Sequence, residues 1–277
     1  MDYDLEFEKP LATLAEEITI MQQEGGSLEH ATRLQEATNE LAELTQEIYA
    51  GLTSWQTVQI ARHKDRPRAA DYIHLMCDDF LALHGDRTFG DDPALLAGLA
   101  TFNEQTVMLI SQHKGRGAEQ QRHNFGMPHP EGYRKAYRLM KMAGKFHFPV
   151  VCLIDTPGAF PGLEDEERGQ SEAIAANLYL MSRLPVPIVA VVIGEGGSGG
   201  ALGISVADRL LMQEYSVYTV AAPEAAASIL WRDTSFAQAA ANAMRISARE
   251  LVATQIIDGL VSEPSGGAHR DYVQAAG

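Results

Sequence analysis

A burst of glycines near the middle of the chain is the stretch whose residue types point most directly to chemistry. Residues 191–208 read VVIGEGGSGGALGISVAD, an apolar run followed by five glycines within seven residues and then by small apolar residues. This order predicts a strand, a turn and the start of a helix. Glycine permits close backbone approach and unusual φ angles, so the turn is suited to holding something against its backbone.

A dinucleotide-binding turn is one interpretation of the burst. Gly194, Gly196 and Gly199 fit the GxGxxG pattern, and Glu214 follows Gly194 by twenty residues, where an acidic residue would hold a ribose. However, only about ten residues separate the glycines from the next strand, which is short for the usual crossover helix, and a lone GxGxxG is a weak signal.

A serine-hydrolase nucleophile turn is a second interpretation. Gly196, Ser198 and Gly200 fit GxSxG, and Asp258 and His269 follow in the order that such a triad requires. Many sequences have a carboxylate and a histidine downstream of a serine, so this order is weak evidence. His269 also lies beside two glycines near the end of the chain, where a surface loop is the simpler expectation.

A third interpretation uses the backbone instead of a side chain. The segment Ser198-Gly199-Gly200 at the start of a helix can direct two unpaired N–H groups at a developing oxyanion, and it needs no nucleophile. A purely structural turn, in which only glycine fits, remains a fourth possibility. The stretch alone does not separate these four.

A second glycine loop follows the preceding apolar strand. The predicted strands Val150–Ile154 and Ile188–Ile193 run directly into DTPGAFPG (155–162) and GEGGSGG (194–200). Ligands of parallel sheets gather at the carboxyl ends of strands, so we expect the two loops to line one pocket. DTPG also resembles a GTPase magnesium loop, but the sequence lacks the GxxxxGK[ST] motif which that function needs.

Cations gather in residues 112–135 of an otherwise acidic chain. The formal net charge is −15 and the pI is near 5.0, which argues against a large nucleic-acid or anionic-membrane footprint. Phosphate or carboxylate binding and an ordinary solvated surface are both open for the five basic residues of this segment, which are Lys114, Arg116, Arg122, Arg134 and Lys135.

Composition limits the remaining classes. Cys77 and Cys152 are far apart and have no metal-type spacing, so neither a zinc site nor a disulfide framework is expected. The N-terminus has no apolar leader, and the longest apolar run, Ile188–Ile193, is too short to span a membrane. These features predict a cytoplasmic protein.

Two types of segment must position the loops. Apolar residues at helical spacing predict an antiparallel helical pair within the first sixty or so residues, interrupted at Gly25-Gly26-Ser27. After Pro67, strands and helices alternate, which predicts a largely parallel sheet covered by helices. Besides the two strands above, the expected strands are 95–102, 106–112, 209–213 and 217–220, and the expected helices are 131–146, 168–184, 199–206, 224–231, 236–244 and 248–257, the last with a Ser247/Glu250 capping box.

Seven motifs in a fixed order are more specific than any one of them. The motifs are QHKGR (112–116), NFGMPHPEGYRKAYRLM (124–140), DTPGAFPG (155–162), ERGQSEAIAANL (167–178), GEGGSGGALG (194–203), PEAAASILW (223–231) and GGAHR (266–270). With these motifs the chain, from about Phe7 to Arg270, closely resembles the carboxyltransferase alpha subunits of bacterial-type acetyl-CoA carboxylase.

The resemblance implies a crotonase-like α/β fold, a superhelix of ββα units over 67–277, with an N-terminal helical extension over 1–66. It implies carboxyl transfer from carboxybiotin, held on a biotin carboxyl carrier protein, to acetyl-CoA, giving malonyl-CoA for fatty-acid synthesis. The implied partners are a zinc-ribbon-bearing beta subunit in an α2β2 assembly and, in the wider complex, biotin carboxylase; no metal is expected in this chain. A relative that acts on another acyl-CoA, or a biotin-dependent decarboxylase, stays open.

The resemblance also assigns roles within the two loops. The backbone N–H groups of Gly199 and Gly200 would form the oxyanion hole for the ureido oxygen of biotin, and a hole for the thioester would lie on the partner. In that case Ser198 is no nucleophile and Glu195 is structural. Residues expected to shape the substrate pocket are Gly196, Gly197, Ser198, Thr156, Pro157, Gly158, Ala159 and Phe160. Between Gly115 and Asn124 the chain is poorer in Lys and Arg than the family usually is.

Overall fold

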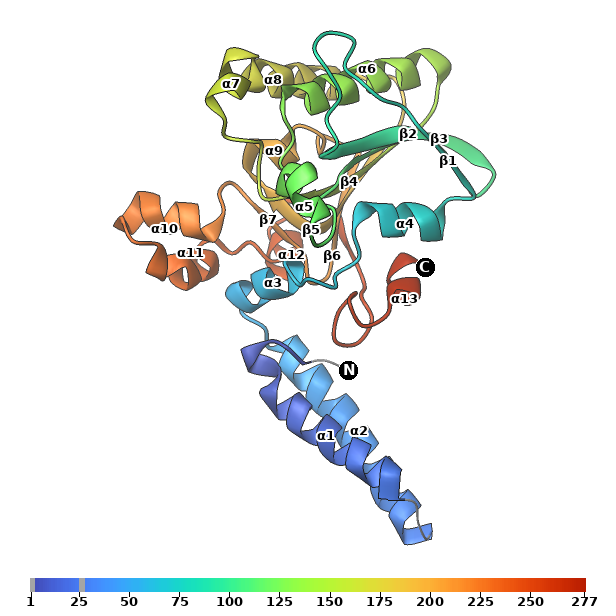
Figure 1. The fold of residues 1–277 in the computed structure, drawn as a ribbon, viewed down its shortest axis with the longest axis vertical. Coiled ribbons are helices and arrows are strands. Elements are labelled where there is room, and N and C mark those ends of the chain that lie inside the picture. Colours follow the sequence, from blue (N-terminus) through green and yellow to red (C-terminus); the bar gives the residue numbers. More distant parts are fainter. Residues whose placement is uncertain (1–2, 25–27) are drawn as a thin grey trace.

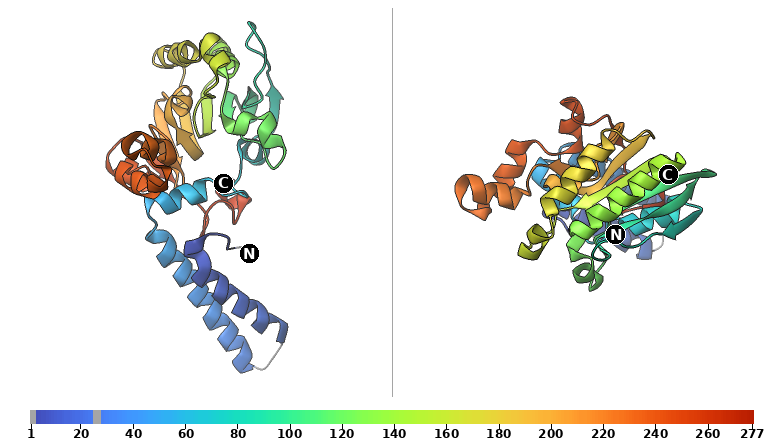
Figure 2. Two further views of the ribbon diagram at one scale, coloured as in Figure 1. Left: turned by 60° about the vertical axis from the view of Figure 1, so that its left-hand side comes forward. Right: turned by 90° about the horizontal axis from the view of Figure 1, so that it is seen from above.

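The first two long helices form an arm that projects from the rest of the molecule. A computed structural model describes residues 3–24 and 28–277 of the chain. The arm consists of α1 (Lys9–Glu24) and α2 (Leu28–Ala50), preceded by the short helix η1 (Glu6–Glu8). The predicted helical pair is confirmed, and Figures 1 and 2 show the two helices side by side, away from the body. The predicted break at 25–27 lies outside the described residues.

The root of the arm is fastened to the body by a buried polar contact. Glu8 is fully buried and accepts hydrogen bonds from the hydroxyl of Tyr49 and the guanidinium of Arg270, both at 2.6 Å. The Tyr49 ring also packs edge-on against Tyr215 with 5.3 Å between centroids. Residues from α2, the N-terminus and the C-terminal region therefore share one small core. The domain boundary expected at residue 66 stays a prediction.

A mixed sheet forms the centre of the body. Its strand order is β1-β2-β3-β4-β5-β6-β8, with β7 paired to the far end of β5; β1, β2 and β3 are antiparallel, and the remaining pairings are parallel. The largely parallel sheet is thus confirmed. The strands are β1 (Asp79–Ala82), β2 (Leu95–Phe102), β3 (Gln105–Gln112), β4 (Val150–Thr156), β5 (Ile188–Gly197), β6 (Arg209–Gln213), β7 (Val217–Thr219) and β8 (Gly259–Val261).

Alternation along the central strands sends apolar side chains to both faces. On one face, Ile110 and Cys152 pack beneath α6 (Pro130–Phe146) and α8 (Gln170–Met181), which run side by side in Figure 2. On the other face, Leu109 and Leu153 pack against α4 (Ala69–Met76). Burial on both faces explains the continuous apolar runs that the sequence has in β4 and β5.

Shorter helices complete the body. Two of them, α10 and α11, pack on each other at one side of the sheet, and α3 lies between them and the arm (Figure 1). The remaining bounds are α3 (Ser54–Ala61), α5 (Glu119–Arg122), η2 (Asn124–Gly126), α7 (Leu163–Glu167), α9 (Ser198–Leu202), α10 (Pro223–Trp231), η3 (Thr234–Phe236), α11 (Ala237–Met244), α12 (Ala248–Ala253) and α13 (Tyr272–Ala276). None of the described helices has both the length and the apolar character that a membrane crossing requires.

Several predicted boundaries were wrong for local reasons. The helix expected over 168–184 is shorter at both ends: it begins only at Gln170, because Gly169 adopts a left-handed φ of 85° between α7 and α8, and it ends at Met181. The helix expected to reach residue 257 ends at Ala253, and Gln255 just beyond has a φ of 59°. The capping box of Ser247 and Glu250 is confirmed.

The glycine burst itself is mostly strand, where a turn was predicted. β5 continues through Gly197, pairing Gly196 with Thr156 of β4 on one side and with Tyr218 of β7 on the other. A Cβ on Gly196 would stand 2.4 Å from the ring of Tyr218, so glycine is what allows this ring to lie on the strand. The turn is confined to the step from Gly197 into α9.

Candidate functional site

The two glycine loops are packed directly against each other. A Cβ on Gly197 would stand 2.1 Å from the carbonyl oxygen of Pro157, and one on Gly200 would stand 2.3 Å from the backbone nitrogen of Ala159. Real side chains do not fit at such distances, so these glycines are needed for backbone to meet backbone. The two loops therefore meet at the strand ends; that they line one substrate pocket stays a prediction, because the pocket beside Gly199 is lined by Ser198 and Gly199 but by no residue of 155–162.

The 155–162 loop is held in shape by its own polar groups and by two neighbours. The Thr156 hydroxyl donates to the carbonyl oxygen of Gly158 at 2.7 Å and accepts from the Gly158 N–H at 3.1 Å. The Phe160 N–H donates to the Pro128 carbonyl at 3.1 Å, and the Gln170 side-chain amide donates to the carbonyls of both. The loop is therefore a fixed wall.

The N–H groups of Gly199 and Gly200 are available to a ligand. They lie in the first turn of α9, whose geometry gives them no partner within the helix, and within the described part of the chain neither N–H donates to any acceptor. Gly200 is buried, whereas a Cβ placed on Gly199 would meet no atom within 4 Å outside its own helix and chain neighbours. Gly199 thus borders an accessible space, and the unpaired N–H of Gly200 lies one residue further along the same turn.

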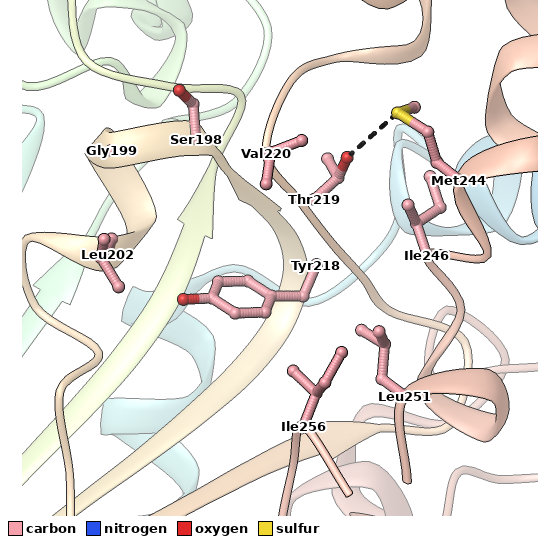
Figure 3. Close-up of a pocket in the computed structure, with 10 residues that line it drawn as sticks. All are labelled: Ser198, Gly199, Leu202, Tyr218, Thr219, Val220, Met244, Ile246, Leu251 and Ile256. Carbon is pink, nitrogen blue, oxygen red and sulfur yellow. Dashed lines mark hydrogen bonds between the residues drawn. The ribbon is translucent and has the colours of Figure 1, made fainter. Parts of the chain in front are cut away.

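That space is a pocket of about 490 Å³ lined mainly by apolar side chains (Figure 3). Its polar groups are mostly satisfied within the protein, because the Tyr218 hydroxyl bonds to the Ser205 hydroxyl at 2.8 Å and Thr219 donates to Ala221. The hydroxyl of Ser198 points away from the other lining residues in Figure 3. The lining residues are Ser198, Gly199, Leu202, Tyr218, Thr219, Val220, Met244, Ile246, Leu251 and Ile256.

The residues proposed for a serine-hydrolase triad are not assembled. His269 stacks on His63 with 4.1 Å between ring centroids, and neither ring nitrogen of His269 has a hydrogen-bond partner among the described residues. Asp258 instead accepts from the Leu210 N–H at 2.7 Å and from Arg209 at 3.2 Å. A general base needs a carboxylate on one side and the nucleophile on the other, so this arrangement does not support the hydrolase.

The stacked histidines predict a pH dependence of stability. Burial, with the nearby charges of His63 and Arg270, lowers the pKa of His269 from 6.5 to about 3. Between those two values the unfolded chain holds more protons than the folded one, so the free energy of unfolding falls as the pH drops below 6.5. We expect His269→Phe, which keeps a stacked ring, to lose less stability than wild type between pH 6.5 and 4.5 in urea unfolding. If the free energies of unfolding of wild type and variant differ by the same amount at every pH, the prediction is contradicted.

A buried ion network links the ends of β4 and β5, the two strands that lead into the loops. Lys114 donates to Asp155, the first residue of the 155–162 loop, and to Glu195 of β5, with both distances 2.7 Å. Arg68 also contacts Asp155, at 3.1 Å, and Arg62 contacts Glu195 at 2.7 Å. Burial alone would raise the pKa values of Asp155 and Glu195, but these cations outweigh it and lower both.

Glu195 therefore has a structural place in the network, as expected, and its backbone N–H bonds to Asp155 at 3.0 Å. The sequence interpretation missed Arg62 and Arg68. Residues 61–68 read ARHKDRPR, a second basic cluster that could have indicated them.

Removing the central cation of this network is expected to be strongly destabilising. Lys114→Met leaves two buried carboxylates with one cation each, and breaking a buried pair costs about 3–5 kcal/mol. Because Arg62 and Arg68 remain, we expect about 3 kcal/mol in urea unfolding at pH 7. The exposed Lys141→Met is the matched control and should change stability by less than about 0.5 kcal/mol. Equal effects of the two substitutions would argue against the network.

The other cations of segment 112–135 are mostly paired within the chain. Arg116 contacts Asp71 at 2.6 Å, Arg134 contacts Asp86 at 2.8 Å, and Lys135 contacts Asp91 at 2.6 Å. Arg122 is the exposed exception: within the described part of the chain it forms none of these ion pairs. The segment therefore serves internal ion pairing more than an anion site.

One group of side chains has the composition of a metal site. The ligand atoms of His129, Glu131 and Asp165 lie within 4.8 Å of one another. Arg168 pairs with both carboxylates, at 2.8 Å to Glu131 and 3.1 Å to Asp165, and His129 is itself paired with Asp165. Because Arg168 already supplies the positive charge, the group is better described as an ion-pair cluster.

Comparisons with known proteins agree along almost the whole chain. A family profile described as "Acetyl co-enzyme A carboxylase carboxyltransferase-like" matches residues 4–277. Two similar proteins carry the name acetyl-coenzyme A carboxylase carboxyl transferase subunit alpha. That of Listeria monocytogenes is 49% identical over 279 residues, covering 100% of this chain and 88% of its own, and that of Methylococcus capsulatus is 52% identical over 277, covering 98% and 86%.

Solved structures share the fold at low sequence identity. Transcarboxylase 12S, with methylmalonyl-coenzyme A and methylmalonic acid bound, superposes with a TM-score of 0.62 and 20% identity, covering 79% of this chain and 43% of its own. A single-chain, multi-domain long-chain acyl-CoA carboxylase gives a TM-score of 0.61 and 19% identity, covering 79% and 23%. Identities this low support a common fold and no more.

Proposed function

The chain belongs to the family of acetyl-CoA carboxylase carboxyltransferase alpha subunits, and from this premise we propose how its two glycine loops act. Its fold is crotonase-like α/β, and it is the alpha component of a biotin-dependent carboxyltransferase that forms malonyl-CoA from acetyl-CoA. An alpha subunit implies a beta-subunit partner.

The backbone N–H groups of Gly199 and Gly200 form the oxyanion hole. Carboxybiotin, when bound, supplies an activated carboxyl group, and negative charge develops on its ureido oxygen as that group leaves. Two unpaired N–H groups beside an open pocket can stabilise this charge without rearranging. One such donor is worth about 10²–10³ in kcat. The unpaired pair of donors is the observation on which the proposal rests.

The pocket fits a biotin group in both size and character. Its volume of about 490 Å³ lies in the usual range for small-molecule sites, and its apolar walls suit the hydrocarbon part of the group. Ser198 and Gly199 border this pocket, whereas the 155–162 loop packs against the backbone of Gly197 and Gly200 next to them. From there, in the proposal, Thr156, Pro157, Gly158, Ala159 and Phe160, together with Gly196 and Gly197, bound the substrate.

An exposed apolar surface beside the pocket is suited to the beta subunit. Val220, at the pocket rim, is 83% exposed, and Ile229 and Leu230 at the end of α10 are 76% and 65% exposed. Trp231 and Phe236 lie next to them with 5.8 Å between ring centroids. The methyl group of acetyl-CoA must come beside the carboxybiotin bound at Gly199 and Gly200, so a partner that covers this surface and holds the thioester would complete the site. We further propose a zinc-ribbon-bearing beta subunit, a biotin carboxyl carrier protein and biotin carboxylase as the assembly.

Reconstitution tests this function. Carboxyl transfer from malonyl-CoA to a soluble biotin derivative would be followed by acetyl-CoA release, with this chain alone, with the cognate beta subunit alone and with both. Activity only in the mixture is expected, because each chain contributes part of the site. A verified complex with no activity on malonyl-CoA, or with activity only on another acyl-CoA, would overturn the assignment of substrate. Failure of the two chains to associate would overturn the proposal that they form one active site together.

A further inference from the structure

The carbonyl oxygen of Gly200 is held by two side chains from other elements. The side-chain amide of Gln112 donates to it at 2.8 Å, and the hydroxyl of Tyr133 donates to it at 3.0 Å. Both side chains have no exposed surface. Gln112 ends β3 and Tyr133 lies in the first turn of α6, so both donors come from regular elements of the body. Two buried donors thus converge on one residue of the glycine turn.

This carbonyl needs such partners because α9 is short. The N–H of Gly203 donates to Gly199 at 2.9 Å, whereas the N–H of Ile204 donates to Ala201 at 3.2 Å. The carbonyl of Gly200, between these two acceptors, receives the side chains instead. A buried carbonyl without any partner is costly, so both donors contribute to keeping the turn in this conformation.

The Tyr133 ring supports the same helix at a second point. A Cβ on Gly203 would stand 2.8 Å from the Cε1 atom of Tyr133, so the ring lies against the end of α9 while its hydroxyl holds Gly200. Burial raises the pKa of Tyr133 well above 10, so the hydroxyl stays a donor at every pH at which the protein is folded. Tyr133 therefore contacts α9 at two points, Gly200 through its hydroxyl and Gly203 through its ring.

We propose that Gln112 and Tyr133 are positioning residues for carboxyl transfer, which set the direction of the Gly200 N–H. The inference rests on the proposed function of Gly199 and Gly200. The carbonyl and the N–H of Gly200 belong to neighbouring peptide planes that meet at its Cα, and glycine has no side chain to resist rotation there. A fixed carbonyl holds the plane that follows Gly200, and the close packing on Ala159 holds the Cα, so together they restrict where the Gly200 N–H points. Oxyanion donors act only when they are preorganised at about 3 Å from the charge, and a displacement of about 1 Å can cost a hundredfold.

Conservative variants of both residues test the proposal in the complex with the beta subunit. Tyr133→Phe keeps the ring on Gly203 and removes one donor, and Gln112→Met keeps the volume and removes the other. We expect kcat for transfer to fall about tenfold in each and about a hundredfold in the double variant, while KM for the biotin derivative changes less than about twofold. Misdirected donors weaken transition-state binding without blocking the pocket.

Tyr72→Phe is the matched control. Tyr72 is also buried, and its hydroxyl also donates a buried hydrogen bond, here to the side-chain oxygen of Gln213 at 3.0 Å, but on the opposite face of the sheet. We expect it to lower stability about as much as Tyr133→Phe with an unchanged kcat. A kcat of Tyr133→Phe and Gln112→Met within twofold of wild type, or a loss no greater than in the control, would overturn the proposal.

A readout without activity separates this inference from the proposed function. Amide hydrogen exchange of the segment 198–205 in the isolated chain should be faster in the double variant than in wild type, because the hydrogen-bonded amides of Gly203 and Ile204 lose their support. Unchanged exchange would contradict the positioning role whatever the complex does. An inactive wild-type complex with faster exchange in the double variant would instead count against the proposed function and support the positioning.

Discussion

Replacing Gly199 by valine is expected to abolish carboxyl transfer while the chain still folds. Nothing lies within 4 Å of a Cβ at this position, so the native structure accepts the side chain without shifting. The branched group would instead stand in the pocket, beside the two N–H groups that the proposed mechanism needs. We expect kcat/KM in the complex to fall at least a hundredfold, with a melting temperature within a few degrees of wild type.

Gly90→Val is the matched control for this prediction. A Cβ on Gly90 also meets nothing within 4 Å, and Gly90 lies in the loop before β2, outside the pocket. The same chemical change should leave transfer within about twofold of wild type. Full activity of Gly199→Val would contradict the placement of the reacting group, whereas a large loss of stability would contradict the open space seen at Gly199.

Replacing Gly200 by alanine is expected to damage both stability and activity. The added Cβ would stand 2.3 Å from the Ala159 nitrogen and from the Gly158 carbonyl carbon, so one of the two loops must move. Overpacking of this kind typically costs about 1–3 kcal/mol, and backbone neighbours relax less readily than side chains. In urea unfolding we therefore expect the free energy of unfolding to fall by about 3 kcal/mol, the upper end of this range. We also expect at least a hundredfold loss of transfer activity, because the N–H groups move with the loop.

Gly259→Ala provides the comparison for Gly200→Ala. The nearest atom to a Cβ at Gly259 is a methyl carbon of Leu211 at 3.4 Å, an ordinary contact. This variant should change stability by less than about 0.5 kcal/mol. Similar stabilities of the two variants would mean that the loops are not pressed together as the structure has them.

Local patterns predicted the main elements of the fold but not their ends. β4 and β5 were predictable because their continuous apolar runs reflect burial on both faces. The extension of β5 through Gly197 was not, because it depends on Tyr218 and Thr156 pairing with the glycines from other strands. β1 and β8 were missed, since each is only three or four residues long and lies at an edge of the sheet.

The sequence predicted where the candidate site lies better than it predicted which side chains hold the site in place. The meeting of the two loops followed from their places at adjacent strand ends, whereas the roles of Gly199 and Gly200 came from the family resemblance. Gln112 and Tyr133 are 88 and 67 residues away from Gly200, and no spacing rule connects them to it. The same holds for Arg62, which reaches Glu195 across 133 residues.

The central claim is that backbone N–H groups perform the stabilisation, and an amide-to-ester replacement at Gly200 tests it most directly. The ester removes one N–H and leaves every side chain in place. An ester at Gly203, whose N–H bonds to the Gly199 carbonyl at 2.9 Å, is the control for a lost backbone donor outside the oxyanion hole. The account predicts that kcat for transfer falls about 10²–10³-fold for Gly200 and less than about fivefold for Gly203. A Gly200 ester as active as the Gly203 ester would contradict it.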